Sequence, residues 1–202
     1  MTSRKASLLC AAAVLAALVP LACAACDTAL LVIDVQNAYV RTLDLTTIDG
    51  IPLVDRLVEV IATARAAGLP VIYIQQRDPR FSVGSPDLAI PEAIAPRDGD
   101  PTIWKSHPDA FRATDLQATL VRLGTRRLLI CGLATTGCVD ATVFGAIQHT
   151  YETWVLADAH SGGGSLQTLA YYNSTWPVVG ATVVRSDVID FAALACAAPP
   201  SP

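Results

Sequence analysis

The sequence has few charged residues and lacks any run of basic ones. Charged residues make up 16% of the 202, and 14 Lys and Arg stand against 18 Asp and Glu, which gives a formal net charge of −4. Without a basic patch, neither a nucleic acid nor an anionic membrane surface is an expected partner. The sequence also lacks internal repeats, low-complexity linkers and blocks of like charge. A chain of this length with 52% hydrophobic residues therefore fits one domain with a sizeable core.

An apolar N-terminal segment accounts for part of this hydrophobic content. Arg4 and Lys5 precede an apolar run over residues 6–23, and Ala22 and Ala24 supply a small-x-small site at its end. This order is typical of a secretory signal peptide, residues 1–24, that is cleaved after Ala24; the alternatives are an uncleaved anchor and a lipoprotein signal. Cleavage removes Arg4 and Lys5 from the 14 basic residues and leaves 12 against 18 acidic ones. Residues 25–202 would then form a secreted or periplasmic domain without stable membrane insertion.

Four cysteines remain in the predicted mature chain. Cys26 and Cys196 flank the domain, and export favours oxidised pairs, so a disulfide between them is one pairing that the sequence allows. Cys131 lies inside an apolar run and is expected to be a reduced core residue. Asn173 begins an Asn-Ser-Thr glycosylation sequon, which matters only in a eukaryotic host. Cys138 is the remaining cysteine, and it lies where a strand pattern gives way to a helix pattern.

Apolar runs alternate with helical spacing along the rest of the chain. The runs predict strands over residues 28–34, 71–74, 102–105, 127–131, 153–157 and 181–184. The spacing between them predicts helices over residues 54–68, 115–124, 138–151 and 166–179, with residues 75–100 as a long loop. Six strands alternating with helices predict an α/β fold, a three-layer sandwich with a mainly parallel six-stranded sheet.

Three polar side chains follow the predicted strands at their carboxyl ends, where ligands bind in parallel sheets. Asp34 and Lys105 end two apolar runs, and Cys138 follows a small-residue turn at the start of a helix. A helix N-terminus presents free N–H groups and a positive dipole end, so we expect it to lower the thiol pKa. Each residue also has a purely structural alternative. Asp34 could cap the end of a strand, Lys105 could be a solvated surface lysine, and Cys138 could be a small core residue.

Three stretches resemble the isochorismatase-like cysteine hydrolases, the relatives of nicotinamidase, N-carbamoylsarcosine amidase and streptothricin hydrolase. They read LLVIDVQNAY from residue 30, WKSHPDAF from residue 104 and CGLATTGCVDAT from residue 131. The resemblance extends over about residues 28–190, and the last stretch is the most specific. It implies an isochorismatase-like, Rossmann-like fold and a homo-oligomer.

The resemblance also implies a catalytic triad of Asp34, Lys105 and Cys138. Cys138 would attack a carbonyl to form a thioester, while Asp34 would take the thiol proton and pass it to the leaving nitrogen. Lys105 would stabilise the thiolate and hold Asp34 in position. The N–H groups of Ala134 and Cys138 would form an oxyanion hole. A non-proline cis peptide would join Leu133 to Ala134 in the same turn.

Further residues are candidates for binding a small-molecule substrate. Gln36, Asn37 and Tyr39 follow Asp34 and could line a pocket, and Trp104 and Phe111 could supply an aromatic wall. For each of them, packing in the fold is the alternative role. A long variable loop over residues 75–100 would set specificity, so the sequence does not name the substrate.

Departures from the family narrow the expected reaction. Nicotinamidases carry a metal-binding Asp-x-His after the second strand, but residues 75–79 here read QQRDP. The histidines are His107, His149 and His160, which do not form that cluster, so we expect no catalytic metal or cofactor. We expect His160 in a surface loop, with a position near the site entrance as the alternative. Isochorismatases tend to lack the cysteine, so Cys138 favours hydrolysis of an amide-type C–N bond. The alternatives are an isochorismatase-type ether hydrolase and an inactive relative that binds a small molecule or a partner.

Overall fold

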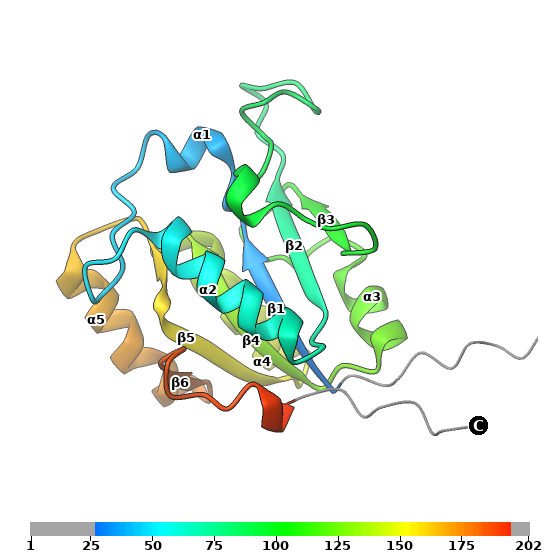
Figure 1. Cartoon of the computed structure of the whole chain (residues 1–202), viewed down its shortest axis with the longest axis vertical. Coiled ribbons are helices and arrows are strands. Elements are labelled where there is room, and N and C mark those ends of the chain that lie inside the picture. The colour runs from blue at the N-terminus through cyan, green and yellow to red at the C-terminus, as the bar shows by residue number, and fades with distance from the viewer. Residues whose placement is uncertain (1–26, 195–202) are drawn as a thin grey trace, which may run out of the picture.

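The computed structural model describes residues 27–194, and its centre is a six-stranded sheet (Figure 1). The strands are β1 (Thr28–Ile33), β2 (Val71–Gln76), β3 (Thr102–Lys105), β4 (Arg127–Leu133), β5 (Glu152–Ser161) and β6 (Thr182–Val184). Their order is β3-β2-β1-β4-β5-β6, and every neighbouring pair is parallel. The predicted α/β class and parallel sheet are confirmed. The predicted signal peptide and the Cys26–Cys196 pairing lie outside the described residues.

Helices cover both faces of this sheet. They are α1 (Asn37–Val40), α2 (Leu53–Ala66), α3 (Leu116–Leu123), α4 (Asp140–Gln148) and α5 (Leu166–Thr175), with a π-helical turn over Thr135–Val139. Helix α2 lies on one face of the sheet, and α3 and α4 lie on the other (Figure 1). Within residues 27–194, no helix is long and apolar enough to span a membrane.

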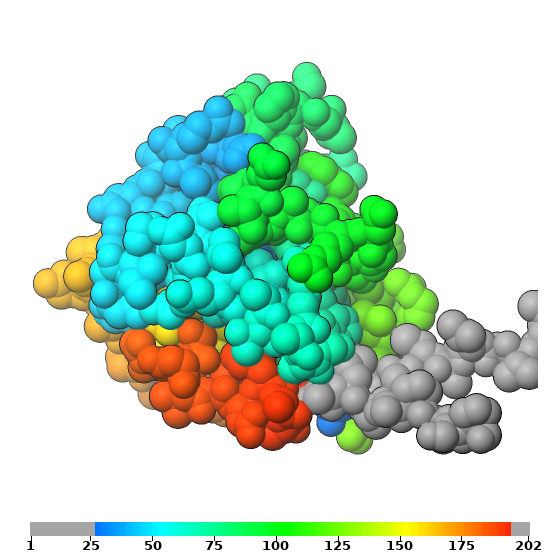
Figure 2. Space-filling model, viewed as in Figure 1, coloured from blue at the N-terminus to red at the C-terminus, as the bar shows by residue number. Residues whose placement is uncertain are grey.

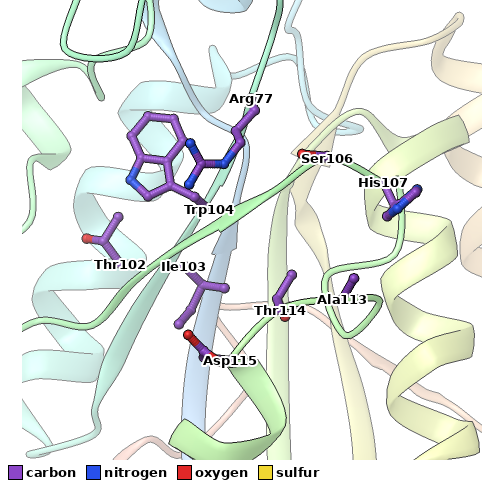
Figure 3. A pocket seen from close by; sticks show the side chains of 9 residues that line it. All are labelled: Arg77, Thr102, Ile103, Trp104, Ser106, His107, Ala113, Thr114 and Asp115. Atoms are coloured by element: carbon purple, nitrogen blue, oxygen red, sulfur yellow. The ribbon is translucent and has the colours of Figure 1, made fainter.

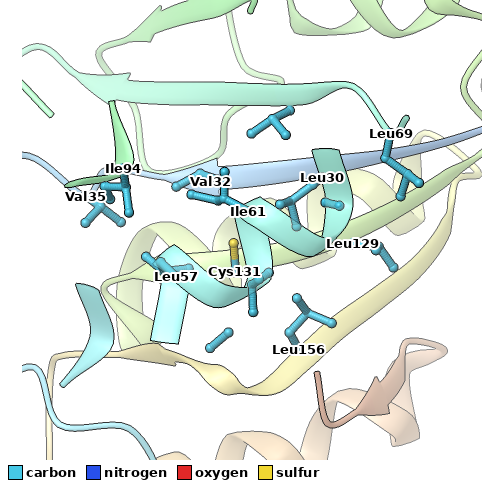
Figure 4. Close-up of a cluster of buried hydrophobic side chains, with 14 of the residues drawn as sticks. Leu30, Val32, Val35, Leu57, Ile61, Leu69, Ile94, Leu129, Cys131 and Leu156 are labelled. Atoms are coloured by element: carbon cyan, nitrogen blue, oxygen red, sulfur yellow. The ribbon is translucent and has the colours of Figure 1, made fainter. Parts of the chain in front are cut away.

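The central strand β1 is apolar throughout because it is covered on both faces. Leu30 and Val32 pack into the cluster under α2, shown in Figure 4, whereas Leu31 and Ile33 pack under α3 and α4. All six of its residues are buried. Alternation of side chains across a strand thus fills two cores from one continuous apolar run.

Several predicted boundaries need correction. β2 and β4 each continue two residues beyond the predicted ends, and β5 continues four residues, to Ser161. The predicted helix at Cys138 begins instead with the π-helical turn, and α4 follows it from Asp140. The short helix α1 was not expected. It packs against the long loop between β2 and β3, whose residues Asp87 and Ala89 accept hydrogen bonds from the α1 backbone (Figures 1 and 2).

The order of the strands places a topological switch point at their carboxyl ends. From β1 the chain winds outward through β2 and β3 and then returns to β4 on the opposite side of β1. The connections after β1 and β4 therefore leave in opposite directions, which is where open parallel sheets bind ligands. Gly132 lets the end of β4 lie close against β1, since its φ is +116° and a side chain there would overlap the backbone of Ile33.

Candidate active site

The structure brings Asp34, Lys105 and Cys138 together at this switch point. The Lys105 Nζ lies 2.6 Å from Oδ2 of Asp34 and 3.1 Å from Sγ of Cys138. It also donates to Oε1 of Gln76 at 2.7 Å. Lys105 thus donates hydrogen bonds to Cys138 and Gln76 and forms an ion pair with Asp34. The Lys105 side chain is fully buried, and its charge is therefore held among these partners.

Each triad residue is placed by the end of a strand. Asp34 directly follows β1, and its N–H donates to the carbonyl of Ile74 in β2 at 2.9 Å while its φ is +53°. Lys105 is the last residue of β3 and pairs in register with Gln76 at the end of β2. Cys138 lies in the π-helical turn between β4 and α4. Side chains from three strand ends thus converge although they are 33 to 104 residues apart in the chain.

Burial dominates the electrostatics of the triad. It raises the pKa of Asp34, against the opposing effect of the Lys105 charge. Burial also raises the pKa of the Cys138 thiol to about 12, and the charge of Asp34 adds to this increase while Lys105 opposes it. The expected lowering of the thiol pKa is therefore wrong, because desolvation of a thiolate outweighs the helix terminus and the ammonium group. Burial therefore favours the neutral thiol of Cys138, which lies beside the Lys105–Asp34 pair.

The turn before Cys138 contains the cis peptide that the resemblance implied. The bond between Leu133 and Ala134 is cis. The carbonyl oxygen of Ala134 accepts from the N–H of Gly137 at 3.0 Å and from that of Val139 at 3.2 Å, so the turn closes on itself around Cys138. Cys138 is a free cysteine, as is Cys131 in the core.

The side chain of Gln36 hydrogen-bonds to backbone atoms of the neighbouring strand and loop. Its Nε2 donates to the carbonyl oxygens of Gln76 and Leu88, at 3.2 and 3.0 Å, and its Oε1 accepts from the N–H of Gln76 at 2.8 Å. The residue is completely buried. This arrangement fits a role in holding Gln76 against Lys105 better than contact with a substrate. Sequence reasoning missed Gln76, although its place at the end of β2 follows the same rule that selected Asp34 and Lys105.

Tyr39 lies close to the triad and contacts the long loop. Its hydroxyl donates to Oδ2 of Asp78 at 3.2 Å, and Asp78 pairs with Arg80. Burial, then the charge of Asp78 and, more weakly, that of Asp34 raise the pKa of Tyr39, which places the ring within electrostatic reach of the site. Asn37 instead donates to the carbonyl of Pro86 and so fastens α1 to the same loop.

The two predicted aromatic wall residues have different partners. Trp104 stacks with Arg77, with 5.5 Å from the guanidinium carbon to the ring centroid, beside a cavity of about 630 Å³ at the edge strand β3 (Figure 3). None of the described residues that line this cavity belongs to the triad. Phe111 is buried and stacks on His149, 4.7 Å between centroids, beyond the end of α4. The N–H of the neighbouring Ala110 donates to the Thr142 hydroxyl of α4 at 3.1 Å, so this segment runs along α4, and a substrate contact by Phe111 stays a prediction.

His160 is buried inside β5, and its predicted place in a surface loop is wrong. Its ring contacts the Thr135 hydroxyl at the start of the π-helical turn and the side-chain amide of Asn173 in α5. The Nδ2 of Asn173 donates to the carbonyl of Ala157 at 3.0 Å. The amide nitrogen of the glycosylation sequon is thus engaged inside the fold.

The histidines are dispersed through the described part of the chain. His107 borders the cavity at β3, His149 stacks on Phe111, and His160 lies in the core. Among residues 27–194, no group of three His, Cys, Asp or Glu side chains is placed to hold a metal ion.

Comparisons with known proteins give a consistent match. A model of the isochorismatase domain matches residues 28–184. The ureidoacrylate amidohydrolase RutB of Stutzerimonas stutzeri is 32% identical over 194 residues, which cover 76% of this chain and 78% of that protein. The N-carbamoylsarcosine amidase of Thermoplasma acidophilum has a crystal structure similar to this one, with a TM-score of 0.67 and 28% identity, and the match covers 81% of this chain and 99% of that one. A cysteine hydrolase from Pseudomonas syringae pv. phaseolicola shares the fold, with a TM-score of 0.72 at 20% identity over 80% of this chain and 89% of that one.

Proposed function

This chain belongs to the isochorismatase family of hydrolases, and we propose that within it the protein is a cysteine amidohydrolase that cleaves a C–N bond of a small molecule. The observation that carries the proposal is the position of the Lys105 ammonium, 2.6 Å from the Asp34 carboxylate and 3.1 Å from the Cys138 sulfur. A nucleophile, a base and a cation in contact at a ligand-binding edge are the groups that acyl transfer needs. The amidohydrolase and amidase among its relatives support the same reaction.

The first step is attack by the Cys138 sulfur on the substrate carbonyl carbon. Because the thiol pKa is raised to about 12, the proton leaves sulfur as the S–C bond forms, and Asp34 accepts it. The negative charge then moves to the carbonyl oxygen, where the N–H groups of Ala134 and Cys138 would stabilise it. The Lys105 side chain, in contact with both the Asp34 carboxyl group and the Cys138 sulfur, would stabilise the charge that develops there.

The second half of the reaction returns the site to its resting state. Asp34, now protonated, gives its proton to the departing nitrogen as the C–N bond breaks, which leaves a thioester on Cys138. A water molecule then attacks the thioester, with Asp34 as the base that takes its proton. The C–S bond then breaks, the acid product leaves and Asp34 returns that proton to the Cys138 sulfur, so one amide and one water give one acid and one amine.

We propose N-carbamoyl compounds, the ureido acids, as the first substrates to test. Two of the relatives are named for their substrates, ureidoacrylate and N-carbamoylsarcosine. Both of these compounds carry an N-carbamoyl group. A carbamoyl group offers the carbonyl carbon and the nitrogen leaving group that the triad requires. Simple amides form a second panel that tests the reaction without the carbamoyl preference.

The test is release of ammonia or amine by the full chain, compared with Cys138→Ala. The proposal expects hydrolysis of at least one compound in these panels and its loss in the variant. Hydrolysis of a vinyl ether that survives Cys138→Ala would identify an ether hydrolase instead. Wild-type protein that binds a panel compound without turnover would indicate a catalytically inactive binding relative.

We also propose export through residues 1–24 and assembly into a homo-oligomer. Export rests on the apolar N-terminal run alone, which lies outside the described residues. The N-terminal sequence of protein recovered outside the cytoplasm tests it, and a mature chain that begins at Ala25 would agree. Light scattering of the purified protein tests the oligomer, which a monomeric mass at micromolar concentration would contradict.

A further inference from the structure

Both ring nitrogens of His160 are occupied, and their partners fix its protonation. Nδ1 lies 2.9 Å from Oγ1 of Thr135, and Nε2 lies 2.9 Å from Oδ1 of Asn173. The Nδ2 of Asn173 donates to the carbonyl oxygen of Ala157. A carbonyl oxygen only accepts, so the amide oxygen of Asn173 faces the ring. Nε2 therefore carries the ring proton, and Nδ1 accepts a hydrogen bond from the Thr135 hydroxyl.

A second contact holds the chain on the other side of Cys138. Nε1 of Trp176 donates to Oδ1 of Asp140, the first residue of α4, at 2.9 Å. The ring of Trp176 meets that of His160 edge-on, with centroids 5.0 Å apart. The two rings thus contact the chain three residues before the nucleophile and two residues after it.

The side chains of Thr135, His160 and Trp176 are all buried. His160 and Thr135 have no exposed surface, and Trp176 is 1% exposed. Burial lowers the pKa of His160 to about 4, so the ring stays neutral at neutral pH and Nδ1 stays an acceptor. Loss of either partner would leave a buried polar atom without a hydrogen bond, which the turn could relieve only by moving.

We propose that His160 is a positioning residue that fixes the Cys138 turn through Thr135, and that Trp176 does the same through Asp140. The inference rests on the proposed function, because it assigns a purpose to the turn. His160 touches neither the substrate nor the reacting atoms in this account. It holds Cys138 at its distance from Lys105 and Asp34, and a displacement of about 1 Å in such a site costs about 10²-fold in rate.

Two pairs of variants separate this role from packing. His160→Asn keeps an amide oxygen near the position of Nδ1, whereas His160→Gln keeps an amide nitrogen near Nε2. Thr135→Ser keeps the hydroxyl, and Thr135→Val keeps the shape without it. We expect kcat on the best amide substrate to fall about tenfold or more in Thr135→Val and His160→Gln, with KM within about twofold, and to fall no more than about threefold in the other two. Rates that follow the Tm of the four variants, regardless of which bond is kept, would overturn the proposal.

Alkylation of Cys138 by iodoacetamide gives a readout that needs no substrate. The rate in the full chain is followed across pH on the Cys138 peptide by mass spectrometry. The buried wild-type thiol should titrate well above the ordinary value of about 8.5, and Thr135→Val and His160→Gln should move the midpoint toward that value as the thiol leaves its site. Thr135→Ser and His160→Asn should keep the wild-type midpoint.

The kinetic and the alkylation experiments together distinguish the positioning role from the proposed function. If the wild type hydrolyses no amide but the alkylation midpoints separate as expected, the proposed function fails and the positioning role stands. If an amide is hydrolysed but kcat and the midpoints are the same within each pair, the positioning role fails. Thr135→Val keeps the shape of the side chain. If a His160 variant does not fold, the comparison of Thr135→Val with Thr135→Ser tests the positioning role by itself.

Discussion

Replacing Lys105 with methionine should destabilise the protein by an amount that depends on pH. The Lys105 side chain has no exposed surface and that of Asp34 is 2% exposed, so the variant leaves a carboxylate buried without its cation. Removal of one partner from a buried ion pair costs about 3–5 kcal/mol of unfolding free energy. We expect a loss of this size at pH 8, where Asp34 must be ionised in the unfolded chain.

The pH dependence follows from the direction of the Asp34 shift. Burial already raises the pKa of Asp34 in the folded protein, and without the ammonium group it rises further. An unfolded aspartate titrates near about 3.9. Between that value and the folded pKa, the unfolded state has released a proton that the folded state keeps, so stability falls as pH rises. The loss caused by Lys105→Met should therefore be smallest near pH 4 and largest at neutral pH and above.

Urea unfolding followed by circular dichroism at pH 4, 6 and 8 measures this directly. The matched control is the double variant Asp34→Asn with Lys105→Met, which removes both charges. Because a buried ion pair returns little net stability, the double variant should lie within about 2 kcal/mol of the wild type at every pH. A single variant as stable as the wild type at pH 8, or a loss independent of pH, would refute the buried pair.

Packing and burial give three more expected outcomes. Gly132→Ala should cost more than about 2 kcal/mol in thermal unfolding, because its φ is +116° and its methyl group would overlap the Ile33 backbone. Gly137→Ala, with open space around it, should cost little. Since burial lowers the pKa of His160 to about 4 while an unfolded histidine titrates near about 6.5, stability should fall by up to about 3 kcal/mol as pH drops through that window, and His160→Gln should remove this dependence in urea titrations. Phe111→Leu should lower the Tm because Phe111 is buried, and an accompanying change in KM would place Phe111 at the pocket.

The strands and the convergence of the triad could be predicted because they depend on local patterns. A buried strand reads as an apolar run, and the rule on carboxyl ends then selects Asp34 and Lys105 without knowledge of strand order. The contact of Gln76 with Lys105 could not be predicted, because a glutamine at a strand end does not by itself indicate a catalytic or binding role. Its role depends on the register between β2 and β3, which sets it beside Lys105.

The failures share a cause, which is tertiary burial. The end of β5 reads as a polar loop, yet Asp158 is buried there because Ser186 donates to it from the backbone and the side chain. His160 is buried because Thr135 and Asn173 satisfy both of its nitrogens. The same cause acts on the Cys138 thiol: the sequence pattern predicts the helix terminus that would lower its pKa, but not the burial that raises it.

The most direct test of the account is the mass of the wild-type protein after rapid acid quenching during turnover of an amide or ureido substrate. The account predicts an acyl adduct on the Cys138 peptide that forms and decays with the reaction. Asp34→Asn should form it more slowly, and Cys138→Ala should not form it. Turnover without any adduct on Cys138, at a rate that the alanine variant matches, would contradict the central claim that this cysteine is the nucleophile.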